Sequence, residues 1–126
     1  MLSQKILKEY CSYLKFVKYK GVIQNIKLEY CTDKDENNPN EGDTHIILRL
    51  IQIRKPQRNK GYGSIILKDI IKLANMNNIR VVLYASEKYG SEINRLCKFY
   101  QNHNFHLIEN DVDKKMIYYP NLNIVN

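Results

Sequence analysis

The feature that most constrains this chain is a short glycine-bearing segment between an apolar run and a helical pattern. The segment reads Gln57-Arg58-Asn59-Lys60-Gly61-Tyr62-Gly63-Ser64. The apolar run, residues 46–53, precedes it, and apolar residues at helical spacing follow it over residues 65–76. Glycines let the main chain approach a phosphate closely, and the first free N–H groups of the following helix point at such a ligand. The junction therefore predicts an anion-binding turn, with a turn that holds no ligand as the alternative.

Length and composition indicate one globular domain over residues 1–126, because 44% of the chain is hydrophobic and 26% is charged. No apolar run reaches the roughly 20 residues of a membrane span, since Arg49 interrupts the longest region. The N-terminal residues lack the hydrophobic block of a signal peptide. Cysteines occur three times and far apart, at Cys11, Cys31 and Cys97. We therefore expect neither a disulfide framework nor a zinc site, and a reducing, cytoplasmic setting.

The formal net charge of +7 favours anionic partners such as nucleotides, nucleic acid or an acidic protein surface. Arg58 and Lys60 bring part of this charge to the glycine segment, where the helix dipole adds to it. No basic run is interleaved with aromatic residues in the way that suits single-stranded nucleic acid. Nucleic-acid binding is therefore the minor interpretation.

An acidic, polar segment spans residues 33–43, and its D-x-D-x-N start is similar to a calcium-binding loop. Asn38 stands where that loop has glycine, and Thr44 stands where it has a bidentate glutamate. We therefore predict no metal site. A solvated hairpin tip is the preferred interpretation, and a binding place for a cationic substrate is the other.

Periodicity predicts an α/β (α+β) fold with a mixed central sheet flanked by helices. Gly21 is expected to turn one short strand into the next, and Asn104 to close a helix in a left-handed conformation. The near-continuous apolar character of residues 44–55 predicts a strand covered on both faces. The helix after the glycine segment then links two parallel strands by a right-handed crossover. Helices are expected at residues 2–14, 65–76 and 93–103, and strands at 16–19, 25–31, 44–55, 79–85, 105–109 and 115–119.

Two motifs, in this order and at this spacing, resemble the GNAT superfamily of acetyl-CoA-dependent N-acetyltransferases. That family carries R/Q-x-x-G-x-G/A after its fourth strand, and residues 58–63 fit this pattern fully. About forty residues later the family has an Asn-containing helix that ends in L-Y-x-x-x-G-F. Here Tyr100 and Phe105 match, while Asn104 replaces glycine, a mild change because Asn tolerates positive φ. The resemblance covers roughly residues 44–120, and the chain looks short of the family's first strand and second helix.

The resemblance implies a GNAT-like acyl-CoA N-acyltransferase fold and acetyl-CoA as the donor. In this family the diphosphate of the donor lies on the amides of the glycine loop, and the pantetheine arm pairs with splayed backbone near the end of the fourth strand. Asn94 would also reach the cofactor, although a surface helix residue explains it equally. The cofactor-binding positions carried over onto this chain are Ile51, Gln52, Ile53, Arg58, Asn59, Lys60, Gly61, Tyr62, Gly63 and Ser64.

Tyr100 corresponds to the family's tyrosine that hydrogen-bonds the cofactor sulfur and protonates the leaving thiolate. The alternative is a core tyrosine whose hydroxyl is bound to the backbone. Direct transfer also needs a neutral amine, and deprotonating a lysine-like amine costs about 4–5 kcal/mol at pH 7. Some family members place a glutamate on the fourth strand for this purpose, but residues 44–55 contain no carboxylate. His45 is the first candidate for the base and Glu29 is the second, and the choice stays open.

The leading hypothesis is an N-acetyltransferase that moves an acetyl group from acetyl-CoA to a primary amine by direct transfer. The small size leaves few elements for an enclosed pocket, which favours an exposed protein or peptide amine as the acceptor. The missing carboxylate motivates the alternative, a catalytically inactive acyl-CoA-binding or protein-interaction module of the same fold. An unpaired final strand would in addition permit a homodimer.

Overall fold

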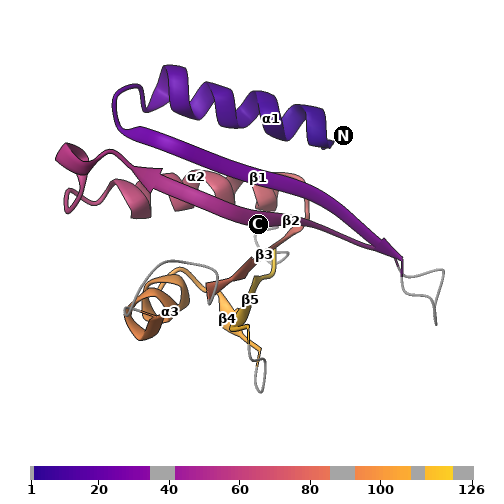
Figure 1. Ribbon diagram of the computed structural model, residues 1–126. Coiled ribbons are helices and arrows are strands. Elements are labelled where there is room, and N and C mark those ends of the chain that lie inside the picture. The colour runs from indigo at the N-terminus through magenta and orange to yellow at the C-terminus, as the bar shows by residue number, and fades with distance from the viewer. Residues whose placement is uncertain (1, 35–41, 86–92, 109–112, 121–126) are drawn as a thin grey trace, which may run out of the picture.

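The structure is a computed structural model that describes residues 2–34, 42–85, 93–108 and 113–120 (Figure 1). Within these ranges the helices are α1 (Gln4–Tyr13), a π-helix (Leu14–Lys18), a short 3₁₀ helix (Lys55–Gln57), α2 (Tyr62–Met76) and α3 (Ile93–Gln101). The strands are β1 (Ile23–Lys34), β2 (Gly42–Ile53), β3 (Arg80–Tyr84), β4 (His106–Leu107) and β5 (Lys115–Tyr118). No helix within the described ranges is both long and apolar enough to cross a membrane.

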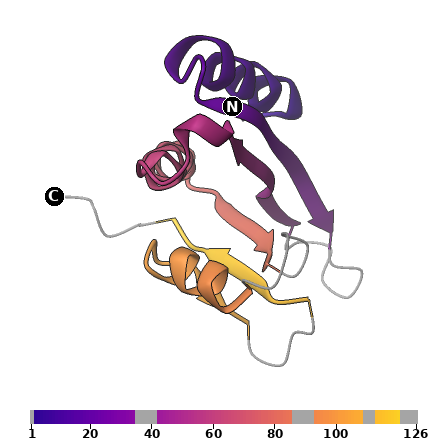
Figure 2. The same ribbon diagram turned by 60° about the vertical axis from the view of Figure 1, so that its left-hand side comes forward.

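The strands form one mixed sheet in the order β1-β2-β3-β5-β4. β2 and β3 are parallel and connected through α2, whereas β1–β2, β3–β5 and β4–β5 are antiparallel. Figure 2 shows α2 along its axis and α3 against β4 and β5. This arrangement confirms the predicted mixed α/β architecture. The expectation of an unpaired final strand is wrong, because β5 pairs with β3 on one side and β4 on the other. That removes the reason given for a homodimer.

One face of the sheet carries the hydrophobic core. The register places Leu28 beside Leu48 and Ile46 beside Val81, and all four side chains are buried. The prediction that β2 is covered on both faces holds for residues 45–48, which are all buried, whereas residues 49–53 are half-buried. Helical residues complete the same core: Leu7, Ile66, Leu67, Ile70, Ala74 and Tyr100.

The predicted strand at residues 16–19 is wrong, because α1 continues there as the π-helix Leu14–Lys18. The backbone N–H of Tyr19 donates to the carbonyl of Leu14 at 2.8 Å, which is the five-residue spacing of a π-helix. This spacing buries both Leu14 and Tyr19 and leaves Phe16 62% exposed. The hydrophobic run therefore follows a widened helix turn and not the two-residue period of a strand.

Two predicted turn residues adopt the left-handed conformation. Gly21 has φ +81° and leads the chain from the π-helix into β1, and Asn104 has φ +68° after α3. The sequence also predicts a helix N-cap at Ser91 and a hairpin turn at residues 110–113. Ser91, most of that turn and most of the acidic segment 33–43 lie outside the described residues.

A cluster of polar contacts fixes the N-terminal helices to α2. The Tyr19 hydroxyl donates to the carboxylate of Asp69, and Lys18 Nζ lies 3.0 Å from Asp69 Oδ2. The Tyr10 hydroxyl donates to the backbone carbonyl of Asp69 at 3.2 Å. Burial first, and the Asp69 charge second, raise the pKa of Tyr10 to about 12. These contacts of Tyr10, Lys18 and Tyr19 with Asp69 thus fix the position of α2, the helix that begins at the glycine segment.

Replacing Asp69 by alanine is expected to lower the free energy of unfolding by about 1–3 kcal/mol, because Tyr19 and Lys18 both lose a charged partner. Urea unfolding followed by circular dichroism measures the change. Lys72→Ala, at an exposed site of the same helix, is the control and is expected to cost less than about 0.5 kcal/mol. Equal losses in the two variants would contradict a role for the cluster.

Candidate active site

The glycine segment forms a tight turn that delivers the backbone into α2. Asn59 and Gly61 both have positive φ, +66° and +83°, and Gly61 is the N-cap residue of α2. The helix begins at Tyr62, three residues before the predicted start, so Gly63 belongs to its first turn. No side chain caps this end. The N–H groups of the first turn and the helix dipole therefore form a donor-rich site for an anion.

Two cationic side chains lie on this turn and are exposed. Arg58 Nε donates to the carbonyl of Ile53 at 3.0 Å, which ties the turn back to the end of β2. Lys60 Nζ donates to Gln57 Oε1 at 3.4 Å. Both positive charges therefore stay at the start of α2, where they add to the field of the helix end.

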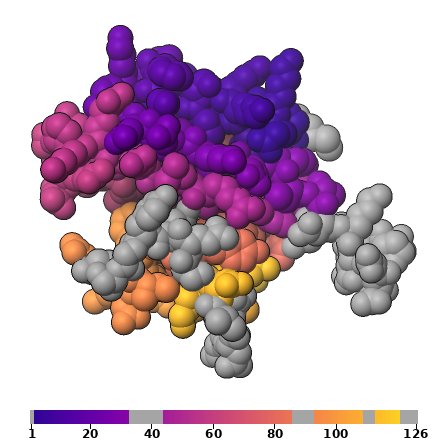
Figure 3. Space-filling model, in the orientation of Figure 1, coloured from indigo at the N-terminus to yellow at the C-terminus, as the bar shows by residue number. Residues whose placement is uncertain are grey.

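The two parallel strands separate next to this turn. Their pairing runs from His45↔Arg80 to Ile47↔Val82, after which β2 continues beside β1 and β3 beside β5. The ribbons diverge toward the end where α2 begins (Figure 1). Figure 3 shows the same division on the surface, with α1, β1 and β2 on one side and α3 and β5 on the other. Ile51, Gln52 and Ile53 lie on the splayed part of β2.

A β-bulge marks the point of separation. Leu28 pairs with Leu48 and Lys27 pairs with Leu50, so Arg49 is the extra residue of β2. A bulge bends its strand and increases the local twist. It stands two residues beyond Ile47, the last position of β2 that pairs with β3. The bend therefore turns β2 away from β3 and opens the sheet at the carboxyl ends of two parallel strands, a common place for ligands in α/β proteins.

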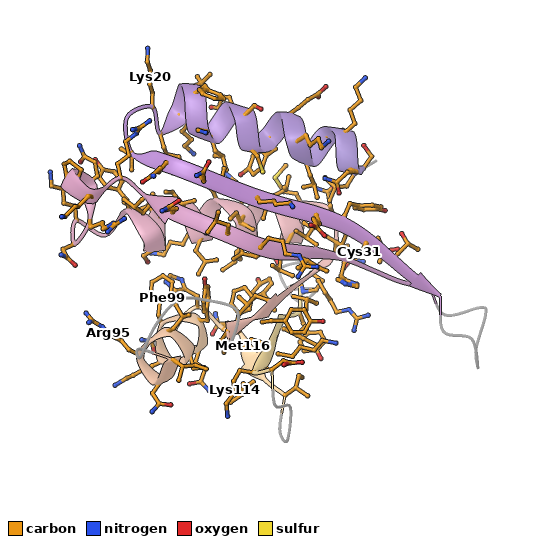
Figure 4. The ribbon with its side chains drawn as sticks, in the orientation of Figure 1. Lys20, Cys31, Arg95, Phe99, Lys114 and Met116 are labelled. Carbon is orange, nitrogen blue, oxygen red and sulfur yellow. The ribbon has the colours of Figure 1, made fainter. Side chains whose placement is uncertain are left out.

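The end of α3 contacts the first turn of α2. A Cβ atom on Gly63 would lie 3.9 Å from Phe99 Cζ, and Ser64 Oγ lies 2.9 Å from His103 Nε2. Figure 4 shows Phe99 on the side of α3 that faces α2 and β2, whereas Arg95 points away from them. Burial first, and the charge of Lys68 second, lower the pKa of His103. The sequence motifs alone did not single out Phe99 or His103 as contacts of the glycine turn.

Tyr100 is 6% exposed and packs between two aromatic rings. Its ring centroid lies 5.2 Å from that of Phe99 and 5.5 Å from that of Phe105. Burial raises the pKa of Tyr100 to about 12, so the phenol is protonated at neutral pH. The structure gives its hydroxyl no hydrogen-bond partner among the described residues. The backbone bond expected of a core tyrosine is therefore not found in this part of the chain.

The two candidate bases lie on the other face of the sheet. Glu29 pairs with Ile47 and His45 pairs with Cys31, so both side chains alternate with the core residues of their strands. The Glu29 carboxylate lies 3.4 Å from Lys27 Nζ and 3.5 Å from Arg49 Nε, and His45 is 5% exposed. The structure does not bring either of them together with Tyr100, which packs in the core.

The structure also locates the start of β2 and the position of Asn94. β2 begins at Gly42 and therefore includes Asp43, at the end of the strand far from the glycine turn. Asn94 is exposed in the first turn of α3. Among the described residues, no cluster of three or more histidine, cysteine or acidic side chains is arranged to hold a metal ion.

No protein-family model and no curated protein sequence matches this chain. Solved structures do. The anti-CRISPR protein AcrVA5 is 20% identical with a TM-score of 0.50, and the match covers 72% of this chain and 88% of AcrVA5. The AtaT Y144F toxin, bound to acetyl-CoA and the C-terminus of the antitoxin AtaR, is 8% identical to this chain with a TM-score of 0.55. A chain of the KacTA–DNA complex is 11% identical with a TM-score of 0.55. Each of these two matches covers 75% of this chain but only 56% of the other. The chain therefore shares the mixed α/β fold of these neighbours, a GNAT-like fold.

Proposed function

We propose that this protein transfers an acetyl group from acetyl-CoA to a primary amine, by direct attack of the amine on the thioester. The observation that carries the proposal is the coincidence of three features at one end of the sheet. These are the uncapped start of α2, the cations of the glycine turn and the separation of β2 from β3. A long, anionic carrier with a thin arm fits such a site, and a structural neighbour contains acetyl-CoA.

The residues divide the binding task between the two ends of the carrier. The N–H groups of Tyr62, Gly63 and Ser64 would receive the diphosphate, together with the charges of Arg58 and Lys60. The splayed backbone of residues 51–53 would pair with the amide groups of the pantetheine arm, since β3 does not occupy that edge of β2. The thioester then enters the sheet near the bulge.

In the chemical step, the neutral amine nitrogen forms a bond to the acetyl carbon and the carbon–sulfur bond breaks. The electron pair of that bond leaves with the sulfur, and Tyr100 donates its proton to the thiolate. The nitrogen releases a proton to solvent as the amide forms, and solvent returns a proton to Tyr100. The raised pKa keeps this phenol protonated at neutral pH, so that its O–H can donate a hydrogen bond to the sulfur as negative charge develops there. The amine must first lose a proton, and the described residues leave the base open between His45, Glu29 and bound water.

The competing proposal is an acyl-CoA-binding module that has the fold without the chemistry. One observation favours it: the Glu29 carboxylate is already held by two cationic side chains, from Lys27 and Arg49. An incoming amine would therefore compete with these two cations for the carboxylate. An exposed protein or peptide amine stays our preferred acceptor, because the chain has few elements with which to enclose a small molecule.

Incubation with acetyl-CoA and a panel of small amines and peptides tests the proposal, with release of the coenzyme A thiol and the mass of the product as readouts. We expect acceptor-dependent thiol release and an acetylated product. Tight acetyl-CoA binding without transfer to any acceptor would favour the inactive module instead. A salt-dependent mobility shift with DNA that survives changes in the glycine turn would favour nucleic-acid binding.

A further inference from the structure

Two side chains join the phosphate-binding end of α2 to the end of α3. Ser64 is the third residue of α2, and its Oγ lies 2.9 Å from Nε2 of His103, three residues after Tyr100. The His103 ring centroid lies 5.0 Å from that of Phe99, which in turn packs against Gly63. The imidazole therefore contacts the first turn of α2, whose N–H groups face the diphosphate in the proposed function.

The hydrogen of the Ser64 hydroxyl can be given to only one acceptor. If Ser64 donates it to His103, no hydrogen is left for a phosphate oxygen. If His103 carries a hydrogen on Nε2, the imidazole donates to Ser64, and the hydroxyl is free to donate to the phosphate. A phosphate at the first turn of α2 therefore favours a His103 that carries a hydrogen on Nε2.

The burial of the ring and the charges near it decide whether that hydrogen comes with a positive charge. Burial first, and the charge of Lys68 on α2 second, lower the pKa of His103, so the free protein holds a neutral imidazole at pH 7. Arg58 and Lys60 on the glycine turn and Lys98 on α3 are the other cationic residues of the neighbouring elements. A diphosphate bound to the Ser64 hydroxyl would bring negative charge close to the ring, because that hydroxyl lies 2.9 Å from Nε2 of His103. An opposite charge at that distance favours the charged imidazolium.

We propose that His103 is a positioning residue for acetyl-CoA: it directs the Ser64 hydroxyl toward the diphosphate and takes up a proton from solvent when the donor binds. This inference rests on the proposed function, because it needs the diphosphate at the start of α2. His103 also links the two halves of the site, since it lies in the turn after α3 and its backbone N–H donates to the carbonyl of Tyr100 at 3.0 Å.

Calorimetric titration with acetyl-CoA at pH 6.5, in two buffers of different ionisation enthalpy, measures the protons taken up. We expect proton uptake in the unaltered protein and an affinity about two- to threefold higher at pH 6 than at pH 8, because a group whose pKa rises on binding favours the complex at the lower pH. His103→Gln keeps a donor toward Ser64 but cannot titrate. Its affinity at pH 8 is expected to stay within about twofold, and its uptake to fall below that of the unaltered protein.

His106→Gln is the matched control, because His106 is exposed on β4 and is expected to leave proton uptake unchanged. The coenzyme A 3′-phosphate also titrates, with a pKa of about 6. The contribution of His103 is therefore the difference in proton uptake between His103→Gln and His106→Gln. Equal uptake in both variants would overturn the inference. An NMR titration of the His103 ring in the unaltered protein gives a second test, and a ring pKa that does not rise with coenzyme A bound would overturn it as well. Failure of the unaltered protein to bind acetyl-CoA would instead refute the proposed function.

Discussion

Replacing Gly61 by aspartate is expected to weaken acetyl-CoA binding by about 100-fold, the largest effect that the site predicts. Gly61 caps the start of α2 with φ +83°. A carboxylate there would face the diphosphate at the positive end of the helix and repel it. Calorimetric titration with acetyl-CoA measures the loss.

Gly21→Asp separates this effect from backbone strain. Gly21 has φ +81°, and a Cβ atom at either glycine meets nothing within 4 Å, so both substitutions carry a similar left-handed cost of about 1–2 kcal/mol. Both variants also change the net charge equally. Only Gly61→Asp is expected to lose the donor, and comparable affinities in the two variants would contradict the assignment of the turn.

Replacing Tyr100 by phenylalanine is expected to lower kcat about 100-fold, the low end of what a general acid contributes, while the Kd for acetyl-CoA changes less than about twofold. The stability of the fold is expected to stay equal or to rise slightly. The hydroxyl is buried without a hydrogen-bond partner among the described residues, and removing such a group relieves its desolvation cost. Steady-state kinetics and urea unfolding measure the two quantities.

Tyr118→Phe is the matched control. Tyr118 is 5% exposed, and its hydroxyl donates to Asn75 Oδ1 at 2.9 Å. Its loss is expected to cost about 1 kcal/mol of stability and to leave kcat unchanged. An unaltered kcat in Tyr100→Phe, or equal losses of kcat in both variants, would remove Tyr100 from the mechanism.

Local chemistry made much of this fold predictable. The glycine turn, the helix after it and the two parallel strands around it each follow from a pattern within their own stretch of sequence. Asn104 was expected to take the left-handed conformation that a helix end needs, and it does so at φ +68°. Such features depend on the conformational preferences of single residues and on hydrophobic periodicity, both of which can be read in sequence.

The rest depends on neighbours that are distant in sequence. Ser64 and His103 lie 39 residues apart, and nothing local to either residue indicates that they meet. The bulge at Arg49 exists only relative to the partner strand β1, so the pattern of β2 alone does not reveal it. The π-helix at residues 14–18 is not visible in the sequence either. Phe16 is apolar but 62% exposed, so it does not mark the buried face of the helix, and the local pattern favours a strand.

A crystal structure of the complex with coenzyme A tests the central claim most directly. The account predicts the diphosphate within hydrogen-bond distance of the backbone nitrogens of Tyr62, Gly63 and Ser64, the pantetheine arm between β2 and β3, and the sulfur beside the Tyr100 hydroxyl. A carrier bound elsewhere on the protein, or a start of α2 that stays without phosphate at saturating coenzyme A, would contradict it.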